Sequence, residues 1–357
     1  MGTKIIPAGM KFWPESPDAV FGYANSPDFT SAQVQQLYEQ GYAGAYEDQD
    51  ERAAFRATMK WAKGEDAARA FGLEGTGADL LILPFLSAMK IWPGCWPGPG
   101  QTTGDCVSWG TKNACLVTLG VEIDLAKPDE VTGKVEGAFD ISPEGISQGV
   151  LSTEVIYGYR GHGGQGADCS RLARYVTTAG GLMIRQNYPD LNLDLTKYNS
   201  SIGARWGGRD TPAEVNAVAK LHQVRTSTEL SGHEQVRDFL ANGYGVNNCS
   251  SLGFSSTRNE DGFSEQRGSW AHSQSMIGAD YRPDTINKYG CPLHLWLNSW
   301  GKWNSGPRRI WGTNIDIPEG AYWAKATLAS RCYLVAFSSV NGWPRKKLPN
   351  YGFSYFG

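Results

Sequence analysis

The sequence has no long apolar run, no cysteines paired at metal-binding spacing and little net charge. Its most apolar stretch, LLILPFLSAM from Leu80, is too short to cross a bilayer and is interrupted by Pro84. The first residues, MGTKIIPAGMKFWPESPD, lack the apolar core and the cleavage site of a signal peptide. We therefore expect no membrane partner, and a place in the cytoplasm or within a viral particle.

Charge and histidine content give no sign of a nucleic-acid partner or a bound ion. The net charge of −3 offers no basic surface, so no nucleic acid is expected. Only five histidines are present, and four of them have no metal-ligand spacing and are expected to be surface or packing residues: His162, His222, His233 and His294. We predict neither a metal site nor a cofactor.

Cysteine is sparse, and its spacing is irregular. The seven cysteines are an odd number without any C-x-x-C pair, which argues against a zinc site or a disulfide scaffold and favours a reducing compartment. Most are expected to be ordinary packing residues, and six have no unusual neighbours: Cys95, Cys115, Cys169, Cys249, Cys291 and Cys332. The seventh, Cys106, has unusual neighbours.

Residues 1–92 differ from the rest in their residue pattern, and they are expected to form an N-terminal helical or docking segment. TSAQVQQLYEQGY and DERAAFRATMKWAKGEDAARAFGL carry helical spacing, and WPGCWPGPGQ then interrupts regular structure near residue 92. The main domain is expected over residues 93–340, followed by a basic and aromatic tail over 341–357.

Within the main domain, helices are expected over about residues 100–200 and strands over about 240–340. ADCSRLARYVTTAGG and GHEQVRDFLANGYG are typical of helices that end at glycine. After residue 245 the strand candidates are GVNNCSSLGF, SWAHSQSMIGADYR, LHLWLNSW, GAYWAKATLA and CYLVAFSSV. Helices followed by an antiparallel sheet predict an α+β fold.

Residues 100–110, GQTTGDCVSWG, place Cys106 behind a glycine-rich turn and at the start of a predicted helix. The unpaired N–H groups and the dipole of a helix N-terminus stabilise a thiolate. The position is therefore typical of a nucleophilic cysteine. The alternative is that Cys106 is one more packing residue.

Three separated motifs resemble those of the papain-like cysteine peptidases, and they occur in the same order. They are Gly104–Cys106 at a helix start, Ala271–His272 in a strand, and NSWG at 298–301. GHGGQGADCSRLARYVTTAGGLMIRQNYP and GAYWAKATLASR are similar to further segments of that family. The resemblance covers about residues 95–340. It implies a two-lobed fold, with one helical lobe and one β lobe, and a thiol hydrolase that acts on polypeptides.

The resemblance also implies a role for each matching residue. Cys106 would attack a peptide carbonyl after passing its proton to His272, and the Asn298 amide would orient the imidazole. Trp300 would shield that hydrogen bond from water. Gln101 would complete an oxyanion hole with the Cys106 backbone N–H. The backbone of the glycine pair Gly163 and Gly164 would bind extended substrate.

Three features depart from the family pattern. Gln101 lies five residues before the cysteine, where the family's glutamine usually lies six before. Asp105 adjoins the thiol, and an ionised carboxylate there would raise the cysteine pKa unless Asp105 caps the helix or faces a cation. The interval of 26 residues between His272 and Asn298 is long, and we attribute it to a hairpin in RPDTINKYG.

Other interpretations of the motifs remain. GISQG at 145–149 matches a serine nucleophile elbow and GHGGQG at 161–166 a dinucleotide-binding loop, but neither follows the strand that such a motif requires. His272 could be a satisfied core histidine. The competing function is a non-catalytic structural or docking protein of a large assembly, such as a phage virion component, with contacts made through residues 1–92 and 341–357.

Overall fold

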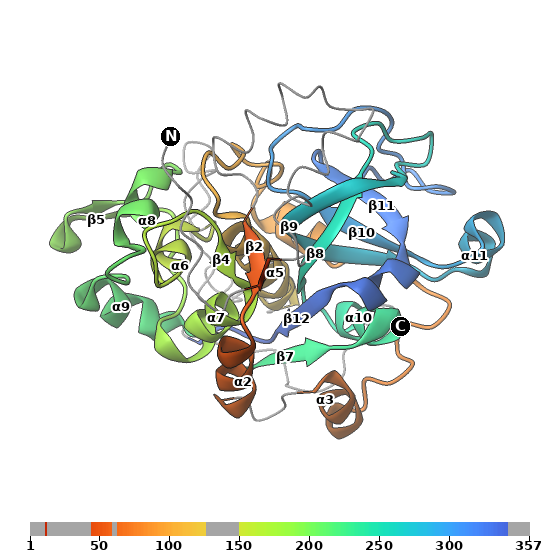
Figure 1. Ribbon diagram of the computed structural model, residues 1–357. Coiled ribbons are helices and arrows are strands. Elements are labelled where there is room, and N and C mark those ends of the chain that lie inside the picture. Colours follow the sequence, from red (N-terminus) through yellow and green to blue (C-terminus); the bar gives the residue numbers. More distant parts are fainter. Residues whose placement is uncertain (1–10, 13–43, 59–62, 126–149, 342–357) are drawn as a thin grey trace, which may run out of the picture.

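The computed structural model describes residues 11–12, 44–58, 63–125 and 150–341. Short helices form one half of the described chain and an antiparallel sheet forms the other, with a long central helix between them (Figure 1). This is the predicted α+β arrangement. The helix expected over 30–42, the GISQG motif and residues 342–357 of the tail lie outside the described residues.

The central helix, α5 (Cys106–Leu125), begins at Cys106, as predicted. Every residue of α5 from Cys106 to Ile123 is buried, so the helix is core on all sides rather than amphipathic. Helix α4 (Phe85–Ile91) packs closely against it. A Cβ added at Gly120 would lie 2.6 Å from the Cα of Ala88, so glycine is needed at this crossing.

The sheet has the strand order β11-β10-β9-β8-β12-β7, with β3 (Leu81–Ile82) also paired to β9. All these pairings are antiparallel, as expected for the segments after residue 245. The other strands are β7 (Ser227–Leu230), β8 (Val246–Phe254), β9 (Gln266–Asp280), β10 (Leu293–Leu297), β11 (Ala321–Lys325) and β12 (Tyr333–Phe337).

Alternation along β9 divides the core into two clusters. Ile277 belongs to the cluster that surrounds α5, whereas its neighbour Met276 belongs to a second cluster on the other face of the sheet. Helix α10 (Gly232–Ala241) covers that second face with Val236 and other apolar residues. The predicted helix GHEQVRDFLANGYG is therefore confirmed.

The helical half contains four short helices: α6 (Glu154–Gly158), α7 (Cys169–Arg174), α8 (Ser200–Trp206) and α9 (Ala213–Ala219). Helix α7 confirms the helix expected in ADCSRLARYVTTAGG. It continues as a π-helical turn, Tyr175–Ala179, that ends before the glycine pair. None of the helices in the described residues has the length and apolar character needed to cross a bilayer.

One expectation about cysteine is wrong. Cys169 at the start of α7 and Cys249 in β8 form a disulfide that links the helical half to the sheet. The partners are 80 residues apart, so their spacing gave no sign of the bond. The other five cysteines are free: Cys95, Cys106, Cys115, Cys291 and Cys332.

A second correction concerns RPDTINKYG, which forms helix α11 (Pro283–Tyr289) between β9 and β10 instead of a hairpin. Pro283 occupies the first helical position, Asp284 lies in the first turn and Lys288 in the last. Gly290 ends the helix with φ of 74°. These are ordinary helix start and stop signals, and they outweigh the turn propensity of the proline and the glycine.

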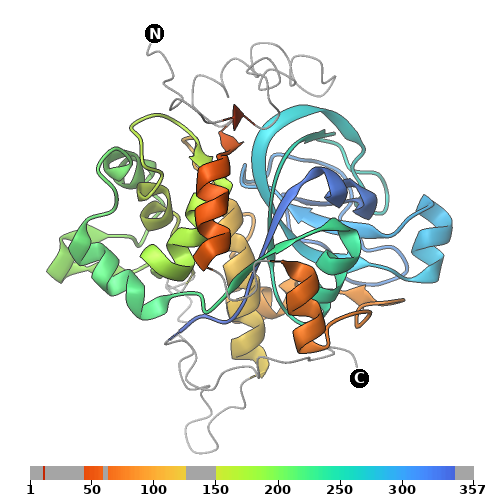
Figure 2. The same cartoon turned by 60° about the horizontal axis from the view of Figure 1, so that its bottom comes forward.

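Residues 44–58 form a strap between the two halves, made of β2 (Ala45–Glu47) and helix α2 (Gln49–Thr58). Both views show the strap running between the helices and the sheet (Figures 1 and 2). Strand β2 pairs in parallel with β4 (Ala167–Asp168) on the helical side and antiparallel with β1 (Lys11–Phe12). Helix α3 (Gly64–Phe71) follows the strap and packs beside α10.

Ion pairs attach α2 to both halves. Glu51 binds Arg171 and Arg174 of α7 at 2.6 Å each, whereas Arg52 and Arg56 bind Glu229 of β7. The aromatic ring of α2, Phe55, is fully buried in the cluster around α5. The predicted boundary near residue 92 lies in the loop between α4 and α5, and the described residues before it share the core of the main domain.

Candidate active site

Cys106 begins α5 and is completely buried in this conformation. Burial raises the pKa of its thiol to about 12, a hydrogen bond from the Ser273 backbone N–H acts in the opposite direction, and the nearby Asp105 raises the pKa further. The thiol is therefore protonated at neutral pH as long as the site stays closed.

His272 lies in β9, and its imidazole is held by Asn298, which directly follows β10. His272 Nε2 lies 2.8 Å from Asn298 Oδ1. The Ser299 backbone N–H also donates to this oxygen, at 2.6 Å, which fixes the orientation of the amide. Because Oδ1 can only accept, Nε2 must carry a hydrogen, and a neutral ring then has its lone pair on Nδ1.

The ring of Trp300 covers this pair. Its centroid lies 4.6 Å from the imidazole centroid of His272 at an interplanar angle of 31°, and Trp270 meets the same imidazole edge-on at 6.2 Å. His272 is only 1% exposed, and burial lowers its pKa to about 4. The imidazole and its hydrogen bond to Asn298 are thus buried beneath aromatic rings, and this burial keeps the imidazole neutral.

Cys106 lies near His272 in the fold, but the thiol and the imidazole do not form a hydrogen bond in this conformation. The thiol lies by the backbone of Ser273, the residue after His272. His272 Nδ1 is buried and has no hydrogen-bond partner among the described residues. The structure thus pairs His272 with Asn298 and places the thiol beside their strand, with the imidazole acceptor unoccupied.

Gln101 ties the turn before Cys106 to the loop that follows Asn298. Its Nε2 donates to the Thr103 carbonyl at 2.8 Å, and its Oε1 accepts from the Ser299 hydroxyl. The Gln101 backbone N–H also donates to the Ser299 carbonyl at 2.8 Å. Its side chain therefore lies in the loop that bears the candidate residues, and it holds that loop together.

Gln165 is a residue of this site that the motifs did not indicate. Its Oε1 accepts from the Thr103 hydroxyl and the Gly104 backbone N–H at 2.7 Å each, and from the Tyr157 hydroxyl at 3.3 Å. It fixes the turn that precedes Cys106. Only its place in a glycine-rich loop marked it in the sequence, and that signal does not identify a partner 61 residues away.

Asp105 pairs with a tyrosine hydroxyl and not with a cation of the described residues. Its Oδ2 accepts from the Tyr198 hydroxyl at 2.9 Å, and the carboxyl is 1% exposed. Burial raises the pKa of Asp105 to about 8. The carboxyl is therefore mostly neutral at pH 7, so the charge effect expected from the sequence is largely removed.

The loop with the two glycines predicted to bind substrate lies at the surface of the helical half. Gly163 has no atom within 4 Å of a Cβ built on it, and the Gly164 carbonyl accepts from Arg160 Nε at 2.8 Å. The backbone pairing of this segment occurs slightly further along. The Ala167 N–H donates to the Gly44 carbonyl of the strap at 2.7 Å.

The strap occupies the space between the segments that carry Cys106 and His272. The Gly44 N–H donates at 2.9 Å to the carbonyl of Ala271, the residue before His272. A Cβ at Gly44 would lie 2.4 Å from Gly166 Cα and 3.3 Å from the carbonyl oxygen of Gly104, two residues before Cys106. The strap thus closes over the candidate site by backbone pairing.

The remaining histidines do not form a second centre. The described residues contain no group of three His, Cys, Asp or Glu side chains that could hold a metal ion. His294 is fully buried beside the Tyr281 hydroxyl, and His162 contacts the Tyr46 hydroxyl in the strap. The loop at 161–166 leads into the two-residue strand β4 and then α7, which is not a dinucleotide-binding unit.

Comparison with known proteins gives structural likeness alone. No protein-family model and no curated protein sequence matches the chain. Among solved structures it is similar to xylellain, a cysteine protease from Xylella fastidiosa, with 12% identity and a TM-score of 0.40 over 67% of this chain and 80% of that one.

Two proforms give similar values. The Amb a 11 cysteine protease of ragweed pollen has 13% identity and a TM-score of 0.47 over 90% of this chain and 87% of its own. Procathepsin B S9 from Trypanosoma congolense has 13% identity and a TM-score of 0.39 over 88% and 100%. Identity and TM-scores in this range assign the chain to no family, and the α+β description rests on its own helices and strands.

Proposed function

We propose that the chain is a thiol hydrolase that cleaves peptide or isopeptide bonds through Cys106, His272 and Asn298. The observation that carries the proposal is the imidazole itself. His272 Nε2 donates to Asn298 beneath Trp300, so the lone pair on Nδ1 is the acceptor that remains. The Cys106 thiol contacts the backbone of the next residue in the same strand, Ser273. A base oriented by a third group beside a thiol is the arrangement that covalent acyl transfer requires.

The proposed reaction has two stages. His272 Nδ1 takes the Cys106 proton while the sulfur attacks the substrate carbonyl carbon, and the imidazolium then protonates the leaving amine as the C–N bond breaks. Water, deprotonated by His272, attacks the resulting thioester and releases the acid and the thiol. Attack by an amine instead of water would make the same residues a transpeptidase. The backbone N–H of Cys106 and the side-chain amide of Gln101 are proposed to stabilise the oxyanion.

Activity requires the strap to leave the site. A buried thiol with a pKa of about 12 and a buried imidazole with a pKa of about 4 do not form an ion pair. Displacing Gly44 from Ala271 and Ala167 would admit water and substrate, and both pKa values would then move toward their ordinary range. The substrate backbone would replace the strap at Ala167, and we propose Gly163 and Gly164 as the neighbouring substrate-binding segment.

The test is selective alkylation of the intact chain with iodoacetamide at neutral pH, mapped by mass spectrometry, together with hydrolysis of unfolded casein. We expect Cys106 to be labelled preferentially, and both labelling and hydrolysis to be lost in His272→Ala. Cys106→Ser should remove hydrolysis without changing the fold. Cys115→Ser, at a buried cysteine of the same helix, is the matched control and should leave both readouts unchanged.

The second candidate is a non-catalytic docking protein of a large assembly, such as a virion component, with residues 1–92 and 341–357 as its contacts. Complete burial of Cys106 beneath the strap favours it. This function predicts slow labelling only of partly exposed thiols such as Cys291, with no effect of His272→Ala. That outcome would reject the hydrolase.

A further inference from the structure

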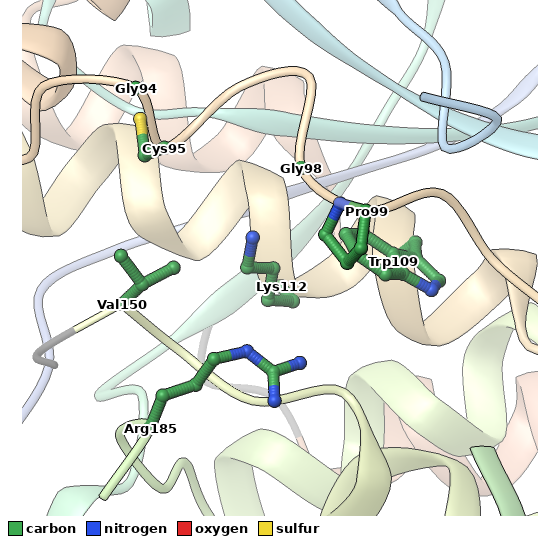
Figure 3. Close-up of a pocket in the computed structure, with 8 residues that line it drawn as sticks. All are labelled: Gly94, Cys95, Gly98, Pro99, Trp109, Lys112, Val150 and Arg185. Atoms are coloured by element: carbon green, nitrogen blue, oxygen red, sulfur yellow. The ribbon is translucent and has the colours of Figure 1, made fainter. Parts of the chain in front are cut away.

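A cavity lies on the helical side of α5, and its lining residues differ from those of the candidate active site. Its volume is about 190 Å³, and Figure 3 shows the side chains around it. The lining comes from the loop before α5, from α5 itself and from the helical half: Gly94, Cys95, Gly98, Pro99, Trp109, Lys112, Val150 and Arg185. Neither Cys106 nor His272 lines it.

Lys112 is the polar centre of this cavity. Its side chain extends from α5 between the 94–99 loop and Arg185 (Figure 3), and the residue is only 2% exposed. An ammonium group has three N–H donors. The described residues supply one acceptor, Asn113 Oδ1 at 3.1 Å, which already accepts from Trp96 Nε1 at 3.0 Å. Two donors of a buried cation therefore lack an acceptor.

The surrounding charges do not neutralise Lys112. Arg185 faces it across the cavity, and the one carboxylate nearby, Glu154, is bound by Arg185 at 3.1 Å. Glu154 also accepts the backbone N–H groups of Thr153 and Asn199 at 3.0 and 2.8 Å. Burial, with Arg185 as the next cause, lowers the pKa of Lys112 to about 7. When Lys112 is protonated, the cavity therefore holds one positive charge that no carboxylate of the described residues balances.

The other walls are apolar. The ring of Trp109 lies 5.1 Å from Lys112 Nζ, and Pro99 and Val150 contribute aliphatic surface. An inorganic ion could satisfy the ammonium group but would leave these walls without contact. A carboxylate attached to a flat or aliphatic body would satisfy both the charge and the apolar surface.

We infer that this cavity binds a small organic carboxylate, with the carboxylate at Lys112 and Arg185 and the apolar body against Trp109, Pro99 and Val150. The site is independent of the chemistry proposed for Cys106. Its polar centre, Lys112, lies six residues after Cys106 on α5, and the inference would stand even if the chain had no hydrolase activity.

The test is isothermal titration calorimetry of the full chain with sodium benzoate at pH 6 and pH 8.5. Because the carboxylate binds the protonated lysine, we expect affinity to fall on the order of tenfold or more between these pH values. Buffers of different ionisation enthalpy should show uptake of close to one proton per benzoate at pH 8.5 and none at pH 6. Inorganic phosphate, the second probe, should bind at least about tenfold more weakly.

Two variants and one control assign the signal. Lys112→Met should abolish binding and proton uptake, and Lys220→Met, at an exposed lysine, should change neither. If Lys112→Met does not fold, Val150→Phe, which fills the cavity without altering charge, should remove binding. Absence of benzoate binding at both pH values, binding without proton uptake at pH 8.5, or phosphate binding as tight as benzoate would each overturn the inference.

Discussion

Burial determines the protonation of the candidate nucleophile and of two side chains near it. The pKa of the Cys106 thiol is raised to about 12, that of Asp105 is raised to about 8, and that of His272 is lowered to about 4. In each case loss of water around the charged form is the largest cause. All three groups are therefore predominantly neutral at pH 7, and the closed site holds no ion pair among them.

Asp105 gives a pH-dependent prediction. Its pKa is raised in the folded chain, so the folded state binds the proton more tightly and the free energy of unfolding falls as pH rises from about 4 to about 8, by about 1.4 kcal/mol per unit. Asp105→Asn removes this loss. Urea unfolding should show the variant gaining roughly 2–3 kcal/mol relative to the unmodified chain between pH 5 and pH 7.5.

The comparison with the unmodified chain cancels His272, whose lowered pKa acts in the opposite direction between about 4 and 6.5. Asp190→Asn, at an exposed position, should show no such pH-dependent gain. Parallel stability curves for Asp105→Asn and the unmodified chain would mean that the buried carboxyl is ionised throughout.

Some residue contacts follow from the sequence and others do not. The pairing of His272 with Asn298 could be predicted because neighbouring strands place both near the same edge, and NSWG marks the second of them. The bonds from Gln165 to Gly104 and from Tyr198 to Asp105 could not, because each joins segments 61 and 93 residues apart through a loop. No periodicity in the chain specifies such contacts.

Among the elements, the strap controls access to the candidate site. Strand β2 pairs with β4, and Gly44 pairs with Ala271 and Ala167. The other end of the strap, α2, is held by ion pairs with α7 and with β7, which lie away from the site. Partly exposed pairs of this kind contribute little each, so the backbone pairing and the buried Phe55 carry most of the closure.

Gly44→Ala tests the strap directly. The new methyl group would lie 2.4 Å from Gly166 Cα, and a backbone atom cannot move aside, so the substitution should displace β2 from the site. We expect alkylation of Cys106 by iodoacetamide to accelerate by at least about tenfold, equivalent to about 1.4 kcal/mol in the opening equilibrium.

Gly163→Ala is the matched control for that substitution, since nothing lies within 4 Å of a methyl group there. It should leave the labelling rate unchanged. Equal rates in Gly44→Ala and the unmodified chain, with circular dichroism showing both folded, would mean that the strap does not limit access to Cys106.

Helices and strands could be predicted where the local sequence signals agree. The prediction failed where the same residues are typical of both a turn and a short helix. The start of α5 follows from the glycine-rich turn, and the strands after residue 245 follow from their alternation and β-branched or aromatic content. Pro283 and Gly290 bound either a turn or a short helix; in the helix, the Thr285 hydroxyl donates to the Asp280 carboxylate at 2.8 Å. The strap's place in the site depends on backbone pairing with Ala167 and Ala271, both more than 100 positions away.

For the molecule as a whole, the Cys169–Cys249 disulfide joins the helical half to the sheet directly behind the candidate site. Cys249 is paired with Ser273 in the register of β8 and β9, and the next pair is Ser250 with His272. The bond therefore anchors α7 to the strand behind the imidazole. It closes a loop of 80 residues, so it restricts the unfolded chain strongly.

Removing this bond should destabilise the chain without changing the contacts of His272. We expect the double variant Cys169→Ser/Cys249→Ser to lose about 3–5 kcal/mol in the free energy of unfolding, because the unfolded chain regains the entropy that the closed loop denied it. Urea unfolding with and without a phosphine reductant measures the effect. Reduction should lower the midpoint of the unmodified chain to that of the double variant and leave the variant unchanged. A midpoint that does not respond to reductant would show that the two thiols are not joined, and the halves would then be held together by the strap and the shared core alone.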